Sequence, residues 1–215
     1  LGILNNVFGI SKQEGGDVEK AFNRIGSVIL GLGQSGLATG DFLTDFGERV
    51  GGVAAQANLS LPVLLSYGAV LQENGVSAEV AGTAFKKLIG SIATKREKFL
   101  AVAQIADSTL TLEKFKDILN NDTAKALQLF FNGLQKGGSK TTQFLDLLKS
   151  VGLDASRAGQ AISALALHQQ DLNGHIQDAT IDYDEATKSA EQFRIKNDTL
   201  AASLAKLQKD RKSVV

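Results

Sequence analysis

The sequence contains no cysteine, methionine or tryptophan, and only one proline among its 215 residues. Without cysteine, the chain cannot form a disulfide, an iron–sulfur cluster or a thiolate zinc site. Its 23 basic side chains are matched by 23 acidic ones, so no net positive charge is available to neutralise nucleic-acid phosphates. Hydrophobic residues make up 43% of the chain, yet no run approaches the roughly 20 apolar residues that span a membrane. We therefore predict a protein with no cofactor, no metal and no nucleic-acid-specific binding.

The beginning of the chain also lacks a signal. Leu1 to Ile10 has no basic start of the kind that opens a signal peptide. Because the chain begins at Leu and contains no Met, we interpret it as a piece of a longer protein. We expect residues 1–16 to form a poorly ordered lead segment.

Apolar residues recur with the period of an α-helix along most of the chain. Leu127, Phe130, Phe131 and Leu134, for example, follow the i, i+3, i+4, i+7 pattern of one buried helix face. No convincing run alternates in the manner of a β-strand, and glycines punctuate the periodic segments. We predict an all-α fold in which residues 17–171 form an array of short helices with Gly-rich joints.

One short phrase occurs twice, as GVSAEVAGTA from Gly75 and as GLDASRAGQA from Gly152, at an offset of 152 − 75 = 77 residues. Each phrase predicts a junction between two helices, with the glycine ending the first helix in a left-handed conformation. Ser77 and Asp154 then act as N-caps of the second helix, and Gly82 and Gly159 allow another backbone to come close. The repeat has two explanations, internal duplication of a hairpin or convergence on a common helix–turn–helix phrase.

Two features resemble chemical motifs. Gly31-Leu-Gly33-Gln-Ser-Gly36 matches the dinucleotide fingerprint GxGxxG, but that motif needs a strand before it. The preceding SVIL belongs to a helical stripe, so we interpret the glycines as a helix–helix joint. His168 and His175 are seven residues apart, whereas a helical zinc pair has i, i+4 spacing. With no nucleophile motif present, we predict no catalytic residues and no enzyme activity.

Residues 172–215 differ from the preceding sequence in the spacing of their apolar residues. These alternate at spacings of four and three, as in a coiled coil. We predict one long heptad helix here. Asn197 occupies an a position, where a single Asn commonly sets register and oligomer state. Both self-association and packing against the rest of the chain are open alternatives. The predicted seam comprises Leu172, Ile176, Tyr183, Phe193, Asn197, Leu200, Leu204 and Leu207.

A longer stretch resembles a known family. GERVGGVAAQANLSLPVLLSYGAVLQENGVSAEVAGTAFKKLI, from Gly47 to Ile89, is similar to the core region of phage tail tape measure proteins. STLTLEKFKDIL and TAKALQLFFNGLQKGG look like the next helices of that region. The resemblance extends from Val18 to Gln170, and GVSAEVAGTA is its most specific element.

The resemblance implies a structural protein inside the phage or prophage tail tube. Such a protein templates tube polymerisation, so that its length sets tail length, and it leaves the tail ahead of the DNA. Implied partners are the tail tube protein, tail assembly chaperones and, at ejection, the host membrane. The implied locations are the virion tail and, during assembly, the host cytoplasm.

An alternative is a helical adaptor that dimerises through its C-terminal coiled coil. A third hypothesis is membrane insertion by the segments Gly26–Gly40 and Gly47–Ala57.

Overall fold

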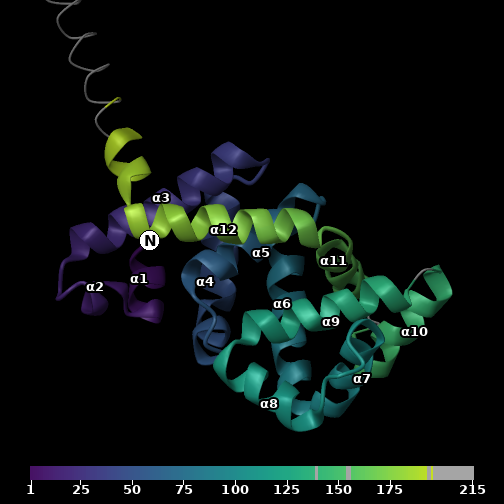
Figure 1. Cartoon of the computed structure of the whole chain (residues 1–215). Coiled ribbons are helices and arrows are strands. Elements are labelled where there is room, and N and C mark those ends of the chain that lie inside the picture. The colour runs from purple at the N-terminus through teal and green to yellow at the C-terminus, as the bar shows by residue number, and fades with distance from the viewer. Residues whose placement is uncertain (139, 154–155, 193–194, 196–215) are drawn as a thin grey trace, which may run out of the picture.

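The computed structural model describes residues 1–138, 140–153, 156–192 and 195. All regular secondary structure in these residues is helical, which confirms the predicted all-α fold (Figure 1). The helices are α1 (Gly2–Phe8), α2 (Ile10–Gln13), α3 (Val18–Ser35), α4 (Gly40–Gln56), α5 (Leu61–Glu73), α6 (Ala78–Thr94), α7 (Arg96–Ala106), α8 (Leu112–Asn121), α9 (Thr123–Gly137), α10 (Thr141–Val151), α11 (Ser156–Leu167) and α12 (Gln169–Glu185).

Several helices begin at side chains that cap their first turn. The hydroxyl of Thr111 accepts a hydrogen bond from the Lys114 amide at the start of α8, and Asp122 does the same for Lys125 at the start of α9. These bonds satisfy backbone donors that have no partner inside the helix. Local sequence therefore sets these helix starts.

Helix α5 lies at the centre of the molecule. Ten of its 13 residues are buried, as expected for a helix that is apolar all round. One face, with Leu61, Leu65 and Ala69, belongs to a hydrophobic cluster shared with α1–α4 and α12. Another face, with Leu64 and Val70, belongs to a larger cluster that extends through α6–α11. Thus α5 joins the two halves of the core.

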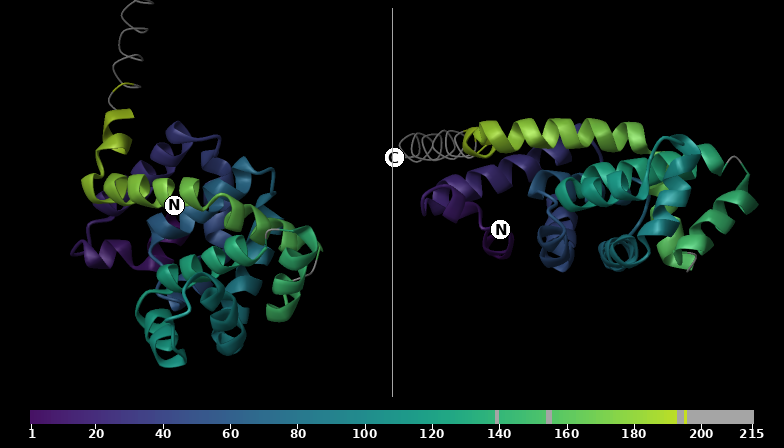
Figure 2. Two further views of the ribbon diagram at one scale, coloured as in Figure 1. Left: turned by 45° about the vertical axis from the view of Figure 1, so that its right-hand side comes forward. Right: turned by 60° about the horizontal axis from the view of Figure 1, so that its bottom comes forward.

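Helix α12 closes the structure on the outside. It runs from α11 along α5 and α3, and both views in Figure 2 show it lying across the other helices. Leu172, near its beginning, is buried in the larger cluster, and Ala179, two turns later, is buried in the smaller one. This helix therefore covers both parts of the core.

Close helix contacts rely on particular glycines. Gly133 of α9 lies against the backbone of α7, so that a Cβ atom at this position would overlap the carbonyl of Val102. Similarly, a Cβ atom at Gly68 of α5 would stand 2.6 Å from the ring of Phe46 on α4. Two helices can approach this closely only where a side chain is missing.

The N-terminal residues differ from the expectation of a poorly ordered lead segment. Residues 2–13 form α1 and α2, and the side chains of Leu4 and Ile10 are 0% and 1% exposed. The Asn5 carboxamide oxygen also accepts a hydrogen bond from the Ser11 amide at 2.8 Å. The burial of these two apolar side chains against α3 and α4 accounts for the order, and the short segment gives no periodic signal.

The C-terminal segment differs from the single heptad helix predicted for residues 172–215. Helix α12 ends at Glu185, and Ala186 takes the left-handed conformation with φ 53°. Residues 187–192 are helical again. The heptad pattern continues through Ala186, but contacts with α3 stabilise a bend at this residue.

Replacing Gly133 with Ala tests the close contact between α7 and α9. We expect Gly133→Ala to lower the free energy of unfolding by about 3 kcal/mol or more, because the added methyl meets backbone that cannot rotate away. Urea unfolding followed by circular dichroism measures the change. The matched control is Gly52→Ala on α4, where the added Cβ meets nothing within 4 Å.

In that control, removal of a mid-helix glycine should raise stability by about 0.5–1 kcal/mol. Equal effects of the two substitutions would contradict the proposed close contact.

Candidate functional site

The two copies of the repeated phrase form the same kind of helix ending. Gly75 and Gly152 both have a left-handed backbone, with φ 75° and 77°. At the first joint, the Val76 amide bonds the carbonyl of Leu71 and the Gly75 amide bonds that of Gln72. At the second joint the donors are Leu153 and Gly152, and the acceptors are Leu148 and Lys149. Every donor and acceptor is displaced by the same 77 residues, and the pattern at each joint is a Schellman motif.

The other predicted joint residues have more varied environments. Ser77 is the N-cap residue of α6, but its side chain makes no capping hydrogen bond. Gly82 lies against α4, where an added Cβ would be 3.3 Å from the Arg49 side chain. Gly159 is buried in α11. Asp154, the second predicted cap, lies outside the described residues.

The second joint also has a contact that the sequence did not indicate. The ammonium group of Lys95 donates a hydrogen bond to the carbonyl of Val151, the last residue of α10, at 3.1 Å. A cation at a helix C-terminus is favourable because the last carbonyls carry partial negative charge. Lys95 comes from the short basic run KREK, which has no pattern that would identify this role.

The described residues of the predicted seam pack against other helices of the same chain. Leu172 is 3% exposed, and Ile176 packs against the same cluster. Tyr183 packs against the smaller cluster and lies under the guanidinium of Arg24, 5.0 Å from the ring centroid. Packing on the same chain therefore occupies this part of the seam. The remaining seam positions, Phe193, Asn197, Leu200, Leu204 and Leu207, lie outside the described residues.

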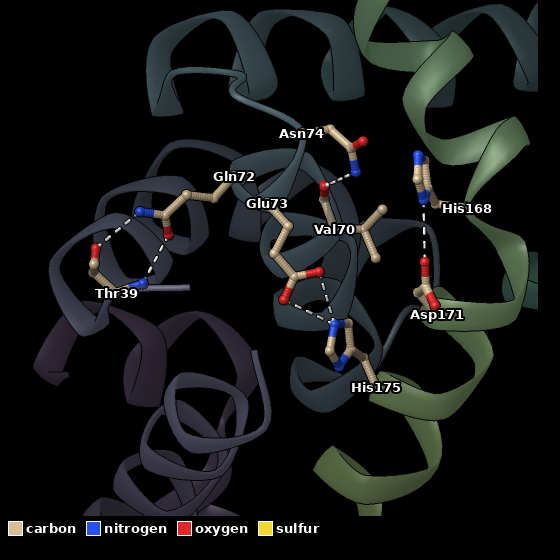
Figure 3. Close-up of polar contacts among 8 residues, drawn as sticks. All are labelled: Thr39, Val70, Gln72, Glu73, Asn74, His168, Asp171 and His175. Carbon is tan, nitrogen blue, oxygen red and sulfur yellow. Dashed lines mark hydrogen bonds and ion pairs between the residues drawn. The ribbon is translucent and has the colours of Figure 1, made fainter. Parts of the chain in front are cut away.

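A groove of about 540 Å³, lined by several polar side chains, opens where the ends of α3 and α5 meet α12. Figure 3 shows its central contact, in which His175 of α12 points toward Glu73, the last residue of α5. The His175 Nε2 atom is 3.0 Å from each carboxylate oxygen, and the side chains are 11% and 18% exposed. Gly36, just after α3, provides the space for this carboxylate, which an added Cβ would overlap.

Other polar pairs surround this groove (Figure 3). The Gln72 side chain accepts a hydrogen bond from the Thr39 amide at 2.8 Å and donates one to the Thr39 hydroxyl at 3.1 Å. At the other side, His168 Nδ1 lies 3.1 Å from Asp171, and the two side chains are 42% and 61% exposed. The Gln72 contacts link the end of α5 to the start of α4, the Glu73–His175 contact links it to α12, and the His168–Asp171 contact is local to the start of α12.

In the Glu73–His175 pair, the carboxylate of Glu73 orients the imidazole ring of His175, as in many catalytic sites. Nucleophilic catalysis would also need a hydroxyl or thiol within hydrogen-bond reach of the imidazole. Within the described part of the chain, the polar partner of His175 is Glu73. The geometry therefore supports a tie between α5 and α12, a role that the sequence could not reveal because the two residues are 102 positions apart.

The helix–helix joint predicted at the GxGxxG glycines lies only at the end of that match in the structure. Gly31 and Gly33 lie within α3, and Gly36 follows its last residue. Because a helix and not a strand precedes the motif, it lacks the context of a dinucleotide site. Gly31 instead gives room for the carboxylate of Asp182 on α12.

Among the described residues, three ionisable groups have shifted pKa values, and each shift has a local cause. Burial raises the pKa of the Tyr67 hydroxyl, and the nearby carboxylate of Asp122 raises it further. Burial also raises the pKa of Tyr183, against the opposing effect of Arg24. Hydrogen bonds from the Thr109 hydroxyl and amide lower the pKa of Asp107. These shifts reflect packing and capping and do not converge on one site.

The described residues contain no group of three or more His, Cys, Asp or Glu side chains that could hold a metal ion. Among the same residues, no helix combines the length and hydrophobicity needed to cross a bilayer. The described residues thus form an all-α fold with two matching helix joints. The model of one family, described as phage-related minor tail protein, matches residues 1–146. This match covers well over half of the chain, and the chain belongs to that family of phage tail proteins.

No curated protein and no solved structure matches the chain. The family match includes α1–α9 and part of α10. It contains the joint at Gly75 but ends before the joint at Gly152 and before α12. The second copy of the phrase therefore lies beyond the matched region.

Left-handed backbone at the two joints predicts a cost for any larger side chain. We expect Gly75→Ala to lower the free energy of unfolding by about 1–2 kcal/mol, because an L-residue is strained at this φ value. Gly152→Ala should cost more, because its added Cβ would also displace the Lys95 ammonium group. Urea unfolding measures both effects. Gly174→Ala, in open space on α12, is the control and should cause no loss.

The tie between α5 and α12 is tested by removing one imidazole at a time. We expect His175→Ala to lower the free energy of unfolding by about 1–3 kcal/mol, because it leaves a partly buried carboxylate without its partner. His168→Ala removes an exposed contact of the same chemical type and should cost less than about 1 kcal/mol. If urea unfolding shows the same loss of free energy for both variants, the Glu73–His175 contact stabilises the fold no more than the exposed His168 contact does.

Proposed function

We propose that this chain is part of a tape measure protein, which templates assembly of the tail tube and sets its length. The observation that carries the proposal is the resemblance of Gly47–Ile89 to the core region of that protein class. This stretch forms the larger part of α4 with α5 and α6, and it lies within the matched phage tail family region. The most specific phrase of the resemblance forms the Gly75 joint.

The proposal also names partners and places. The tail tube protein and the tail assembly chaperones would bind the chain during assembly in the host cytoplasm. In the finished virion the chain would lie in the tube lumen and would leave ahead of the DNA, with contact to the host membrane. Self-association through the heptad register is proposed only for positions after Ala186, because Leu172 is buried within the chain.

The packing of the described helices supports placing a measuring role in the segment that follows them. A ruler made of continuous helix gains 1.5 Å per residue. Helices α1–α12 instead pack side by side, and the longest of them, α3, has 18 residues. The length of this packed part is therefore not proportional to its number of residues. Removing residues from it would also disrupt the hydrophobic core. The segment after Ser189 is therefore the place to test length proportionality.

Tail length should change with the length of residues 190–210. We expect in-frame deletion of these three heptads from the parent gene to shorten tails by up to about 32 Å, in whole tube rings, and duplication to lengthen them equally. The deletion spares Lys188 and Ser189, which contact α12 and α3. Electron microscopy of released tails measures the change.

Replacement of the deleted segment by an unrelated three-heptad sequence of equal length is the matched control, and it should restore normal tails. Normal length in both the deletion and the duplication would refute a measuring role for this segment. Loss of length control in the replacement would show that its sequence matters and its length does not.

A further inference from the structure

The bend at Ala186 separates two segments that share one heptad register. Tyr183, Ala186 and Ala190 keep the spacing of three and four residues that places them on one face of a continuous helix. The backbone nevertheless turns at Ala186, which has a φ of 53° although it is not glycine. An alanine in this conformation is strained, so contacts elsewhere must hold it there.

Side chains of α3 take the place of the helix hydrogen bonds that the bend interrupts. In a continuous helix, the carbonyl of Tyr183 would accept a hydrogen bond from the amide four residues later. Here the Arg24 guanidinium donates to that carbonyl at 2.9 Å. On the other side of the bend, the Ser189 amide donates to the buried hydroxyl of Ser27 at 3.1 Å. Thus α3 caps both helix ends.

An ion pair closes the bend from the inside. The Lys188 ammonium group lies 2.7 Å and 2.8 Å from the two carboxylate oxygens of Asp182, whose side chain is 6% exposed. Six residues separate this pair, a spacing that places two side chains on different faces of a straight helix. The pair therefore exists only in the bent conformation. Gly31 of α3 provides the space for the Asp182 carboxylate.

We infer that the chain has two conformations at Ala186, the bent one and a straight one in which α12 continues through Ala186 as a single helix. In the straight conformation, backbone hydrogen bonds within the helix replace the Arg24 and Ser27 contacts. The Asp182–Lys188 pair separates, and residues 187–192 leave the surface of α3. Arg24 and Ser27 thus form a latch, and the shared heptad register makes the straight helix accessible. This inference does not depend on the proposed tape measure role.

The two conformations predict different distances between Gln170 and Glu191. Both positions are exposed, and the chain has no native cysteine, so a cysteine pair can be spin-labelled cleanly. In a continuous helix the two Cα atoms would be about 32 Å apart, and the bend makes this distance shorter. Pulsed electron spin resonance should show the shorter distance for the otherwise unchanged chain. In the double variant Arg24→Ala/Ser27→Ala, the distribution of distances between the two spin labels should move toward the longer distance.

Two further variants isolate the latch. Ala186→Gly relieves the strain of the bend and weakens the straight helix, so it should return the latch variant to the short distance. Glu14→Gln removes the ion pair that Arg24 makes with Glu14 but keeps the bond to Tyr183, and should leave the short distance unchanged. If the folded latch variant, verified by circular dichroism, keeps the short distance, the inference is wrong. It is also wrong if the unchanged chain shows only the long one.

Discussion

The structure depends on one helix that is buried on nearly all sides. Because α5 has no solvated face, it is stable only where other helices surround it. Its Leu61, Leu65 and Ala69 belong to the cluster shared with α1–α4 and α12, while Leu64 and Val70 belong to the cluster shared with α4 and the helices from α6 onward. The core is therefore continuous from the N-terminal helices to α12. This dependence explains why α1 and α2 fold onto the body, although neither has a strong helical signal of its own.

Glycine determines how closely these helices approach. Gly68 brings α5 against Phe46, and Gly133 brings α9 against the backbone of α7. Gly31 and Gly36 have a different role, since they leave space for the carboxylates of Asp182 and Glu73. A glycine that resembles part of a nucleotide-binding motif in the sequence therefore serves as a contact point for α12. The same residue type performs a second task at Gly75 and Gly152, where backbone conformation requires it.

The C-terminal region shows how tertiary contacts override a sequence pattern. Its heptad spacing is real, and Leu172, Ile176 and Ala179 do form an apolar face. That face is satisfied by the rest of the chain, because α3 and α5 offer apolar surface of their own. Periodicity describes which side of a helix is buried but carries no information on what buries it. In this phage tail protein, packing of that face on its own chain makes α12 part of the folded helical bundle, whereas packing on a second chain would make it part of an extended coiled coil.

The sequence by itself determined the helical fold, the capped helix starts at Thr111 and Asp122, and the two glycine joints. The caps and joints rest on hydrogen bonds between residues no more than five positions apart, and the helical pattern is read from apolar spacings of three and four residues. Only the tertiary structure decided the Glu73–His175 contact, the bend at Ala186 and the partner of α12. The residues involved are separated by 102 positions for the His175 contact and by 159 for the bond between Arg24 and Tyr183. No local pattern encodes such pairs, because they meet only when the helices around α5 are packed together.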